Sequence, residues 1–414
     1  MSSQTGISRK DEPTRDRVPS AASPLVVALD GQLLRNGIAG EAFAERLRSP
    51  FAPFQASIDI TTLPYDQGTI DMLAQARLSG RRTVLKADPA NPIVQSIAGH
   101  LSLFDAIDRH AVTAFRAPRQ AFRPGVWLRA LRVHQWVKNA LIFMPLLAAH
   151  QFTKVDNLRD VLIAFLAFGL CASSVYVLND ILDLKDDRCH KFKKNRPFAS
   201  GALSITSGLV AFPVLLLAAV GVSLARLPLA FTLVLGSYYV LTLSYSLVLK
   251  RVMAIDVIVL AMLYSLRIFA GAAALNLLLT FWMLAFAMFL FLSLALAKRY
   301  AELHDAMDRG LGGKARGRDY EVRDLEMISS LGAAAGYQSV LVLALYVREQ
   351  STVALYSHPD VLWLACPVLL FWITRVWMLT RRGQMHEDPV VFAANDRVSQ
   401  LAGVVFFLIF LAAS

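Results

Sequence analysis

Three spaced aspartates and a group of bases come directly after a long apolar run. The stretch NDILDLKDDRCHKFKKNRP, residues 179–197, places Asp180, Asp183 and Asp187 three and then four residues apart. If the apolar helix before them continues for two more turns, all three carboxylates lie on one face of it, because such spacings return to the same side. Like charges this close repel one another unless a cation neutralises them. The spacing therefore predicts a metal site at these aspartates.

Magnesium is the ion that these ligands suit. It prefers hard oxygen ligands, keeps several waters, and commonly joins one or two carboxylates to substrate phosphates. Bases that could bind the same phosphates directly follow at once, namely His190, Lys193, Lys194 and Arg196. Acid, metal and base together indicate a diphosphate site. The alternative is a solvated, charged turn at a membrane edge, which accounts for single residues better than for the whole pattern.

A second group of candidates surrounds an apolar stretch further along the chain. Asp256 and Arg267 lie 11 residues apart on it, which brings them close to one face of a helix. Charges inside a membrane are costly and usually functional. We predict that Asp256 contacts substrate or metal near Tyr245 and Lys250, and that Arg267 contacts substrate. The alternative places Asp256 at the membrane rim and pairs Arg267 structurally within a helical bundle.

Three more candidates lie at the ends of apolar stretches. Arg299 and Glu302 are one helical turn apart. Snorkelling at a membrane edge would explain Lys298 and Arg299 alone, but it does not require Glu302, so we predict that Arg299 and Glu302 bind substrate. Lys138, in the segment HQWVKN, is a candidate phosphate ligand. Beside Trp136 it would suit a membrane-edge anchor nearly as well.

Composition indicates which elements position these side chains. The chain has 414 residues, of which 56% are hydrophobic and 18% charged, so it is too apolar for a soluble domain. The first 137 residues read as soluble sequence, and the long apolar runs follow them. Nine runs approach the roughly 20 residues that a helix needs to cross a bilayer. They cover about 138–153, 159–178, 206–225, 229–248, 255–274, 278–297, 331–348, 360–379 and 399–413, and the first and last are short.

The basic residues indicate how the nine spans are oriented. With the N-terminus inside, the cytoplasmic connections hold 18 lysines and arginines and the opposite connections hold 4. The cytoplasmic ones are Lys185, Arg188, Lys191, Lys193, Lys194, Arg196, Lys250, Arg251, Lys298, Arg299, Arg309, Lys314, Arg316, Arg318, Arg323, Arg381, Arg382 and Arg397. The opposite ones are Lys154, Arg159, Arg226 and Arg348. We therefore predict an all-α, polytopic protein of a bacterial-type inner membrane, with its N-terminus and its site in the cytoplasm.

The net charge of +11 belongs mostly to these cytoplasmic loops. There it would meet anionic lipid headgroups and phosphorylated substrates, so nucleic acid is not needed to explain it. The three cysteines, Cys171, Cys189 and Cys366, show no paired metal-ligand spacing. We expect neither disulfides nor zinc.

The acidic motif resembles a known one. The pattern N-D-x-x-D-x-x-x-D that begins at Asn179, with the bases after it, is similar to the first aspartate-rich motif of the UbiA-type membrane prenyltransferases. The resemblance covers about residues 127–414, implies a UbiA-like bundle of nine transmembrane helices, and adds Asn179 to the substrate-binding candidates. Further segments resemble one branch, the polyprenyl-phosphate phosphoribosyltransferases, of which decaprenyl-phosphate 5-phosphoribosyltransferase is the type. They are HQWVKN at 134–139, YSLVLK at 245–250, IFAGA at 268–272, AKRYAEL at 297–303 and NDRVSQL at 395–401.

The resemblance also implies a reaction. In that branch the phosphate of a polyprenyl lipid is the nucleophile and phosphoribosyl diphosphate is the electrophile, and the product leads to an arabinose donor for cell-wall synthesis. Mg²⁺ on the three aspartates would withdraw charge from the departing diphosphate, while Lys193, Arg196 and Lys250 would hold phosphate oxygens. Ordinary UbiA members carry a second aspartate-rich motif. The corresponding region here offers only Lys298, Arg299 and Glu302.

Two alternatives stay open. A UbiA-type enzyme that moves a prenyl group from a prenyl diphosphate to an aromatic acceptor would use the same first motif. A transporter would also have many helices and intramembrane charge, but it predicts inverted repeats, and we find no convincing repeat. The sequence does not determine the oligomeric state, so a homo-oligomer also stays open.

The segment before the spans has a different character. Residues 1–22 are polar and lack an apolar signal core, which predicts a disordered tail. Residues 23–115 resemble a truncated α/β segment of the haloacid-dehalogenase type, with SPLVVALDGQLLRNG at 23–37 as first strand and loop and RRTVLKAD at 81–88 as next strand. Ala28 stands where that fold needs an aspartate nucleophile, so we expect an inactive remnant. A basic linker over 116–133 leads to the membrane transferase domain at 134–414.

Overall fold

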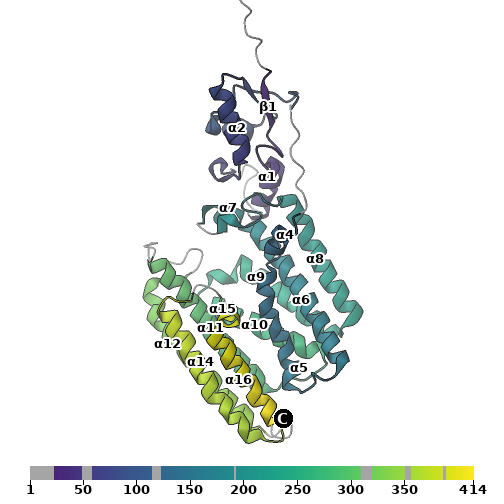
Figure 1. Ribbon diagram of the computed structural model, residues 1–414, viewed down its shortest axis with the longest axis vertical. Coiled ribbons are helices and arrows are strands. Elements are labelled where there is room, and N and C mark those ends of the chain that lie inside the picture. The colour runs from purple at the N-terminus through teal and green to yellow at the C-terminus, as the bar shows by residue number, and fades with distance from the viewer. Residues whose placement is uncertain are drawn as a thin grey trace, which may run out of the picture.

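The computed structural model describes residues 23–48, 58–113, 123–190, 193–308, 319–349, 356–385 and 388–414. They form a small α/β unit above an elongated bundle of helices (Figure 1). The tail expected over 1–22 and the first part of the expected linker, 116–122, lie outside the described residues.

The α/β unit contains a sheet of three parallel strands in the order β1-β2-β3. β1 (Leu25–Ala28) and β2 (Thr83–Lys86) form at the two apolar runs interpreted as strands, and β3 (Ala106–Ile107) completes the sheet. Short apolar runs rich in β-branched residues favour such buried strands. The helices of the unit are α1 (Gly37–Arg48), the 3-10 helix η1 (Ile60–Thr62), α2 (Gln67–Leu78) and α3 (Pro92–Leu101).

Helix α1 docks this unit on the bundle. Ala44 of α1 packs in one apolar cluster with Ile181 and Leu184. Beside it, Glu41 forms a two-pronged ion pair with Arg188, with N–O distances of 2.9 and 2.7 Å, and both side chains are buried. A buried ion pair is stable only when both partners are present. This contact therefore fixes α1 against the segment that carries the aspartates.

The end of the expected linker is helical. α4 (Pro124–Ala130) begins with a proline in its first turn, a position that suits proline, and it buries Val126 and Ala130. These two side chains pack in the same apolar cluster as Val177 and Ile181. The described part of this segment is thus packed against the bundle.

Seven of the predicted spans are confirmed, among the described residues, as helices long and apolar enough to cross a membrane. They are α6 (Val155–Leu182), α8 (Ile205–Arg226), α9 (Leu229–Leu247), α10 (Ile255–Ala274), α11 (Phe281–Asp308), α12 (Leu325–Arg348) with η5 (Val322–Asp324), and α14 (Ala365–Arg381) with η6 (Pro359–Leu364). The last predicted span, 399–413, lies within α16 (Arg397–Ala413), and the short α15 (Pro389–Asn395) meets this helix at 86°. It gives an eighth span if the bent pair is taken as one.

The first predicted span is not a regular α-helix. It forms the 3-10 helix η2 (Val133–Phe143) and the short α5 (Met144–Ala148). A 3-10 helix rises about 2.0 Å per residue, more than an α-helix, so this short segment still runs along much of the height of α6 (Figure 1). The count of nine α-helical spans is therefore not confirmed. Hydropathy could not show this, because apolar residues suit either kind of helix.

Gly271 explains how this segment packs. A Cβ atom at position 271 would collide with the carbonyl oxygen of Ile142, so only glycine lets α10 come this close to η2. Gly271 is part of the segment IFAGA at 268–272. The glycine in this segment is therefore explained by helix packing.

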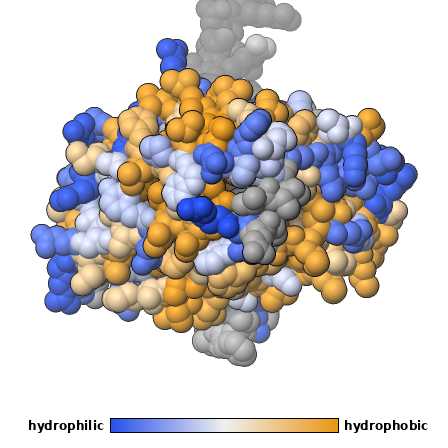
Figure 2. Space-filling view, turned by 90° about the horizontal axis from the view of Figure 1, so that it is seen from below, coloured by the Kyte–Doolittle hydropathy of each residue, from blue (hydrophilic) through white to orange (hydrophobic). Residues whose placement is uncertain are grey.

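The outer surface of the bundle is apolar. Large apolar side chains such as Leu217, Leu233 and Phe371 are more than half exposed. Seen from the end opposite the α/β unit, hydrophobic atoms cover much of the surface, and hydrophilic ones lie at its left and right margins and near its middle (Figure 2). Such surfaces on helices of spanning length belong in lipid. The chain is an integral, multi-pass membrane protein.

Candidate active site

The three aspartates lie where α6 ends. α6 stops at Leu182, Asp183 leaves helical geometry, and the short α7 (Leu184–Cys189) follows. The helix assumed to continue through all three aspartates is therefore interrupted. Repulsion between carboxylates on successive turns and the local hydrogen bonding of aspartate both favour such a break.

Arginines nevertheless bring two of the aspartates together. The guanidinium of Arg196 lies 2.6 Å from the carboxylate of Asp187 and 3.3 Å from that of Asp180. Arg132, which precedes η2, forms a second ion pair with Asp180. Burial raises the pKa of Asp187, and Arg196 opposes this shift. We call these four residues, together with Asp183, the carboxylate cluster.

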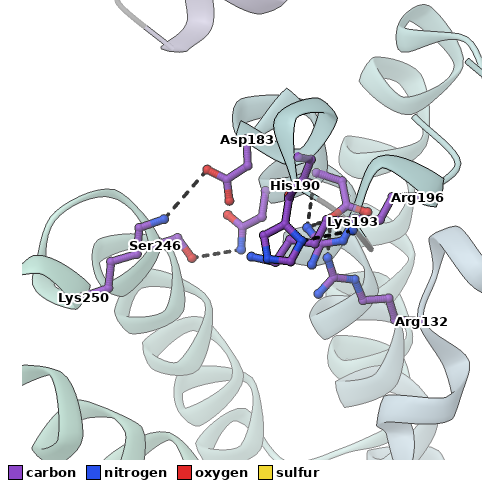
Figure 3. Close-up of polar contacts among 10 residues, drawn as sticks. Arg132, Asp183, His190, Lys193, Arg196, Ser246 and Lys250 are labelled. Atoms are coloured by element: carbon purple, nitrogen blue, oxygen red, sulfur yellow. Dashed lines mark hydrogen bonds and ion pairs between the residues drawn. The ribbon is translucent and has the colours of Figure 1, made fainter. Parts of the chain in front are cut away.

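Asp183 faces a different partner across the site (Figure 3). Its carboxylate lies 3.8 Å from the ammonium group of Lys250, which belongs to η4 (Leu249–Arg251). Next to it, the amide of Asn179 donates a hydrogen bond of 2.9 Å to the hydroxyl of Ser246. The side chain of Asp183 is 41% exposed, whereas those of the other two aspartates are buried. Asp183 is thus the carboxylate most open to a ligand.

His190 and η3 (Lys193–Asn195) lie on the same side of the site as Arg196 (Figure 3). The Nδ1 atom of His190 accepts a hydrogen bond of 3.4 Å from the backbone N–H of Lys193. Lys193 is also close enough to Asp187 and Glu302 for both carboxylates to attract its ammonium group. Of the bases predicted to follow the acidic motif, His190, Lys193 and Arg196 therefore lie beside it, and Lys194 is exposed.

The donor chemistry of the carboxylate cluster fits magnesium. Among the residues that the structure describes, no three His, Cys, Asp or Glu side chains are grouped closely enough to hold a metal by themselves. Magnesium does not require this, because it usually takes one or two carboxylates and completes its shell with water and substrate phosphate. Asp183 and the neighbouring Asp180 offer such oxygens. In this structure Asp180 is neutralised by arginine.

Four of the predicted substrate contacts form one paired group. Arg299 is fully buried, lies 2.8 and 2.9 Å from the two carboxylate oxygens of Asp256, and also forms an ion pair with Glu302. The hydroxyl of Tyr245 donates a hydrogen bond of 3.0 Å to Asp256. This group, which we call the Arg299 group, includes Arg299 and Glu302 from the region in which the sequence lacks a second acidic motif. That its members bind substrate stays a prediction.

A second charged group forms around Asp388. The ammonium groups of Lys138 and Lys298 lie 2.8 and 3.0 Å from one of its oxygens, and the hydroxyl of Tyr264 donates a hydrogen bond of 2.6 Å to the other. Burial alone would raise the pKa of Asp388, but Lys298 and Lys138 outweigh this and hold that pKa below its usual range. We call these four residues the lysine cluster.

Arg267 lies in the middle of α10, next to the lysine cluster. Its guanidinium sits 5.1 to 5.6 Å from the ring centres of Phe168, Tyr238 and Tyr264. It donates hydrogen bonds of 3.1 Å to Asn139 and 3.2 Å to the hydroxyl of Tyr238. Within the described part of the chain no carboxylate forms a direct ion pair with it, and it does not meet Asp256.

Three residues with clear roles in these contacts were not among the predicted ones. Arg132 fell in the expected linker, although its position just before HQWVKN could have drawn attention to it. Asn139 ends the segment HQWVKN, in which only Lys138 was selected as a candidate. Asp388 carried no signal in the sequence, because its partners lie far away along the chain. Distant pairings of this kind need the folded arrangement.

The model of the UbiA prenyltransferase family matches residues 140–401. The chain belongs to this family. The match includes the carboxylate cluster except Arg132, all of the Arg299 group, and every member of the lysine cluster except Lys138. This UbiA family member is therefore a membrane transferase enzyme, and its shared region is the one that holds the charged groups.

Relatives of this UbiA family member extend the match. Decaprenyl-phosphate phosphoribosyltransferase of Mycobacterium tuberculosis is 31% identical over 287 residues, which cover 67% of this chain and 91% of that one. Nodulation protein NoeC of Azorhizobium caulinodans is 35% identical over 289 residues, 69% of this chain and 92% of its own. Uncharacterized protein y4nM of Sinorhizobium fredii is 31% identical over 409 residues and covers 84% of this chain and 79% of its own, so that similarity extends into the region before the spans.

Solved structures show the same fold. A UbiA homolog from Archaeoglobus fulgidus bound to DMAPP and Mg²⁺ matches with a TM-score of 0.53 at 15% identity, over 69% of this chain and 98% of that chain. At this identity the likeness establishes the UbiA fold of the bundle.

Proposed function

We propose that this UbiA family member transfers the 5-phosphoribosyl group from phosphoribosyl diphosphate to a polyprenyl phosphate. A phosphate oxygen of the lipid bonds to C1 of the ribose, and the C1–O bond to the diphosphate breaks, so diphosphate leaves with the bonding electrons. A sugar carbon with oxocarbenium character needs positioning and electrostatic help rather than a protein nucleophile. The 31% identity to a decaprenyl-phosphate phosphoribosyltransferase supports this pair of substrates.

One observation carries the proposal. Where a second acidic motif would stand, the buried guanidinium of Arg299 binds both Asp256 and Glu302. Arg299 therefore neutralises the carboxylates of its own group. In the carboxylate cluster Asp180 and Asp187 are paired with arginines, and Asp183 is the most exposed carboxylate among the described residues of the two groups. A reaction with a single diphosphate, on the sugar donor, needs only one metal site of this kind. This arrangement favours a second substrate that carries a simple phosphate.

The carboxylate cluster would receive the donor. Its aspartates would hold Mg²⁺, which supplies charge neutralisation for the departing diphosphate. Lys250 is already poised beside Asp183, at 3.8 Å, and would bind a diphosphate oxygen directly. Lys193 and Arg196 approach from the opposite side of the site and would hold further oxygens (Figure 3).

An apolar cavity is available for the lipid tail. It has a volume of about 380 Å³ and is lined by side chains of α5, α10, α11, α12 and α16, including Met144, Phe286, Leu343 and Phe406. Long hydrocarbon chains gain free energy when such surfaces bury them. The cavity supports a lipid substrate, but it does not set the chain length.

We also place the reaction at the cytoplasmic face. The excess of lysine and arginine in the connections that carry Lys193, Lys250 and Arg323 supports this orientation. The donor is a charged, water-soluble sugar, which cannot cross the bilayer unaided. An inner membrane of the bacterial type and a cytoplasmic N-terminus follow from the same orientation.

A transfer assay on the purified protein in lipid nanodiscs tests this function. Radiolabelled phosphoribosyl diphosphate is supplied with polyprenyl phosphates of several lengths, with and without Mg²⁺. We expect label to enter the lipid only with Mg²⁺, and to be lost in Asp180→Ala and Asp183→Ala. If label enters lipid only from an isoprenoid diphosphate together with an aromatic acid, the protein is instead an aromatic prenyltransferase.

We further propose that residues 23–115 are a phosphatase-like remnant without activity. Ala28, where such enzymes need their nucleophile, ends β1, and its backbone N–H donates to the side chain of Gln32 over 2.5 Å. Without a nucleophile no phosphoenzyme can form. Hydrolysis of p-nitrophenyl phosphate by the full chain, abolished in Asp30→Asn, would contradict this.

A further inference from the structure

The lysine cluster and Arg267 carry more positive than negative charge. Lys138 and Lys298 bind the same oxygen of Asp388, so two ammonium groups share one carboxylate. The hydrogen-bond partners of the Arg267 side chain are neutral groups. Arg267 is near enough to Lys138 to repel it and near enough to Asp388 to be attracted. Three cations thus share one carboxylate, Asp388, because Glu302, the other carboxylate whose charge reaches Lys298, is already paired with Arg299.

Such an excess is costly away from water. The side chains of Lys138 and Asp388 are 11% and 7% exposed, and Arg267 is 4% exposed. Buried charges in stable proteins are paired or bound to a ligand. An anion with two negative charges would balance the group. A phosphate monoester is such an anion near neutral pH.

An unpaired donor lies in the same place. The side-chain Nδ2 of Asn139 is buried and has no hydrogen-bond partner in the described part of the chain, whereas its Oδ1 accepts from Arg267. A buried N–H without an acceptor costs free energy, and a phosphate oxygen would supply the acceptor. Asn139 follows Lys138 directly, and its side chain is 1% exposed.

The position of the cluster suits the head of a lipid. Tyr264, which binds Asp388, and Ile268, which lines the apolar cavity, are one turn apart on α10. The cluster and the cavity are therefore neighbours along one helix face. Lys298 keeps 28% of its side chain exposed, so the cluster is not sealed. Lys298 also lies within reach of the charge of Glu302 in the Arg299 group.

We propose that Lys138, Lys298, Arg267 and Asn139 form the subsite for the phosphate monoester of the acceptor lipid. Asp388 holds the two lysines in place until the phosphate arrives. The subsite deepens the proposed function and rests on it for the identity of the reaction. Binding of the phosphate itself can be measured without any transfer.

Calorimetry on the full chain in nanodiscs tests the binding, with farnesyl phosphate as the probe. We expect farnesyl phosphate to bind, and farnesol and inorganic phosphate to bind far more weakly, since each lacks either the charge or the tail. Lys138→Gln and Lys298→Gln should each weaken farnesyl phosphate by about 10- to 100-fold, the range for charge-assisted hydrogen bonds. Lys138→Arg and Lys298→Arg keep the charge and should recover most of the affinity. Arg251→Gln, which removes an exposed cation beside Lys250, is the matched control and should change nothing.

Steady-state kinetics add a second readout that a merely structural role would not produce. Lys298→Gln should raise the KM for the polyprenyl phosphate and leave the KM for phosphoribosyl diphosphate unchanged. Lys250→Gln, on the donor side, should do the reverse. Unchanged affinity for farnesyl phosphate in both lysine variants, or loss of donor binding instead, would overturn the subsite.

The two proposals fail in different ways. If farnesyl phosphate binds and the lysine variants lose it, but no phosphoribosyl group is ever transferred, the subsite stands and the proposed reaction does not. If transfer occurs and the lysine variants keep a normal KM for the lipid, the reaction stands and the subsite is wrong. Inorganic phosphate binding as tightly as farnesyl phosphate would also overturn the lipid assignment.

Discussion

The carboxylate cluster and the lysine cluster differ in how many carboxylates they hold and in how these are exposed. The first has three carboxylates, and its Asp183 is 41% exposed. The second has a single carboxylate, Asp388, that is 7% exposed and serves two lysines. Carboxylates with one exposed member suit a metal and a water-soluble donor, and an enclosed group with more cations than anions suits an anionic lipid head. The two clusters therefore match the two proposed substrates in different ways.

The elements behind the two clusters differ as well. The carboxylate cluster lies at the end of α6 and on α7, where the α/β unit docks through Glu41 and Arg188. The lysine cluster joins η2, α10, α11 and the start of α15, all within the bundle. Changes in the α/β unit should therefore reach the first cluster and spare the second.

The largest effect on activity is expected when the negative charge of Asp180 is removed. Asp180→Asn leaves Arg132 and Arg196 without this carboxylate and weakens the proposed magnesium site, so we expect kcat to fall about 1000-fold. Farnesyl phosphate affinity should not change. The measurement is transfer kinetics at saturating Mg²⁺, with Asp186→Asn, an exposed carboxylate on α7, as the control. Normal turnover in Asp180→Asn would show that the carboxylate cluster does not serve the donor, so the proposed division of roles between the two clusters would be wrong.

A smaller effect tests the docking contact. Glu41→Gln leaves the guanidinium of Arg188 buried without its carboxylate, which costs about 3 kcal/mol. Arg188 directly follows Asp187, so we expect the KM for the donor to rise about tenfold and the KM for the lipid to stay constant. Glu45→Gln, on the same helix, is the control. Equal effects on both substrates would show that docking serves overall stability alone.

Gly271→Ala should perturb the lysine cluster. Its new methyl group would push against the carbonyl of Ile142 and displace η2, which carries Lys138. We expect a loss of stability of about 1 to 3 kcal/mol and a few-fold rise in the KM for the lipid. Gly221→Ala, where a Cβ would meet nothing, is the matched control. Thermal unfolding and lipid kinetics measure the two effects, and a donor-specific defect would contradict the assignment.

The smallest effect concerns pH. Lys298 and Lys138 hold the pKa of Asp388 below its ordinary value of 3.8. A lowered pKa means that the stability from the charged carboxylate is fully present above pH 3.8 and is lost only as pH falls below it. The difference in melting temperature between the wild type and Asp388→Asn should therefore be the same at pH 5 and pH 6.5, where both lysines of the wild type are charged. A difference that shrinks between pH 6.5 and pH 5 would show that Asp388 titrates there.

The sequence predicted features that depend on local pattern. Apolar length located the spans from α6 to α14, and short apolar runs located β1 and β2. The spacing of Asp180, Asp183 and Asp187, with bases after them, pointed to the charged group that the fold assembles. These features depend on residues that are close together in the sequence, so a single sequence is enough to predict them.

Other features depend on contacts between distant segments and could not be predicted. The 3-10 conformation of η2, which lies close against Gly271 of α10, reflects packing that composition does not encode. Arg267 and Asp256 were placed near one helix face, but each found its partner on another helix. Asp388 became important only through Lys138 and Lys298, from two distant segments.

The pair of Lys138 and Asp388 has a consequence for biogenesis. It connects the first membrane segment with the segment just before the last helix. Contacts of such high sequence separation form late during synthesis. A nascent chain still lacking Asp388 and α15 therefore leaves its lysines without their counter-charge, and the proposed lipid-binding subsite is complete only after this segment has been made.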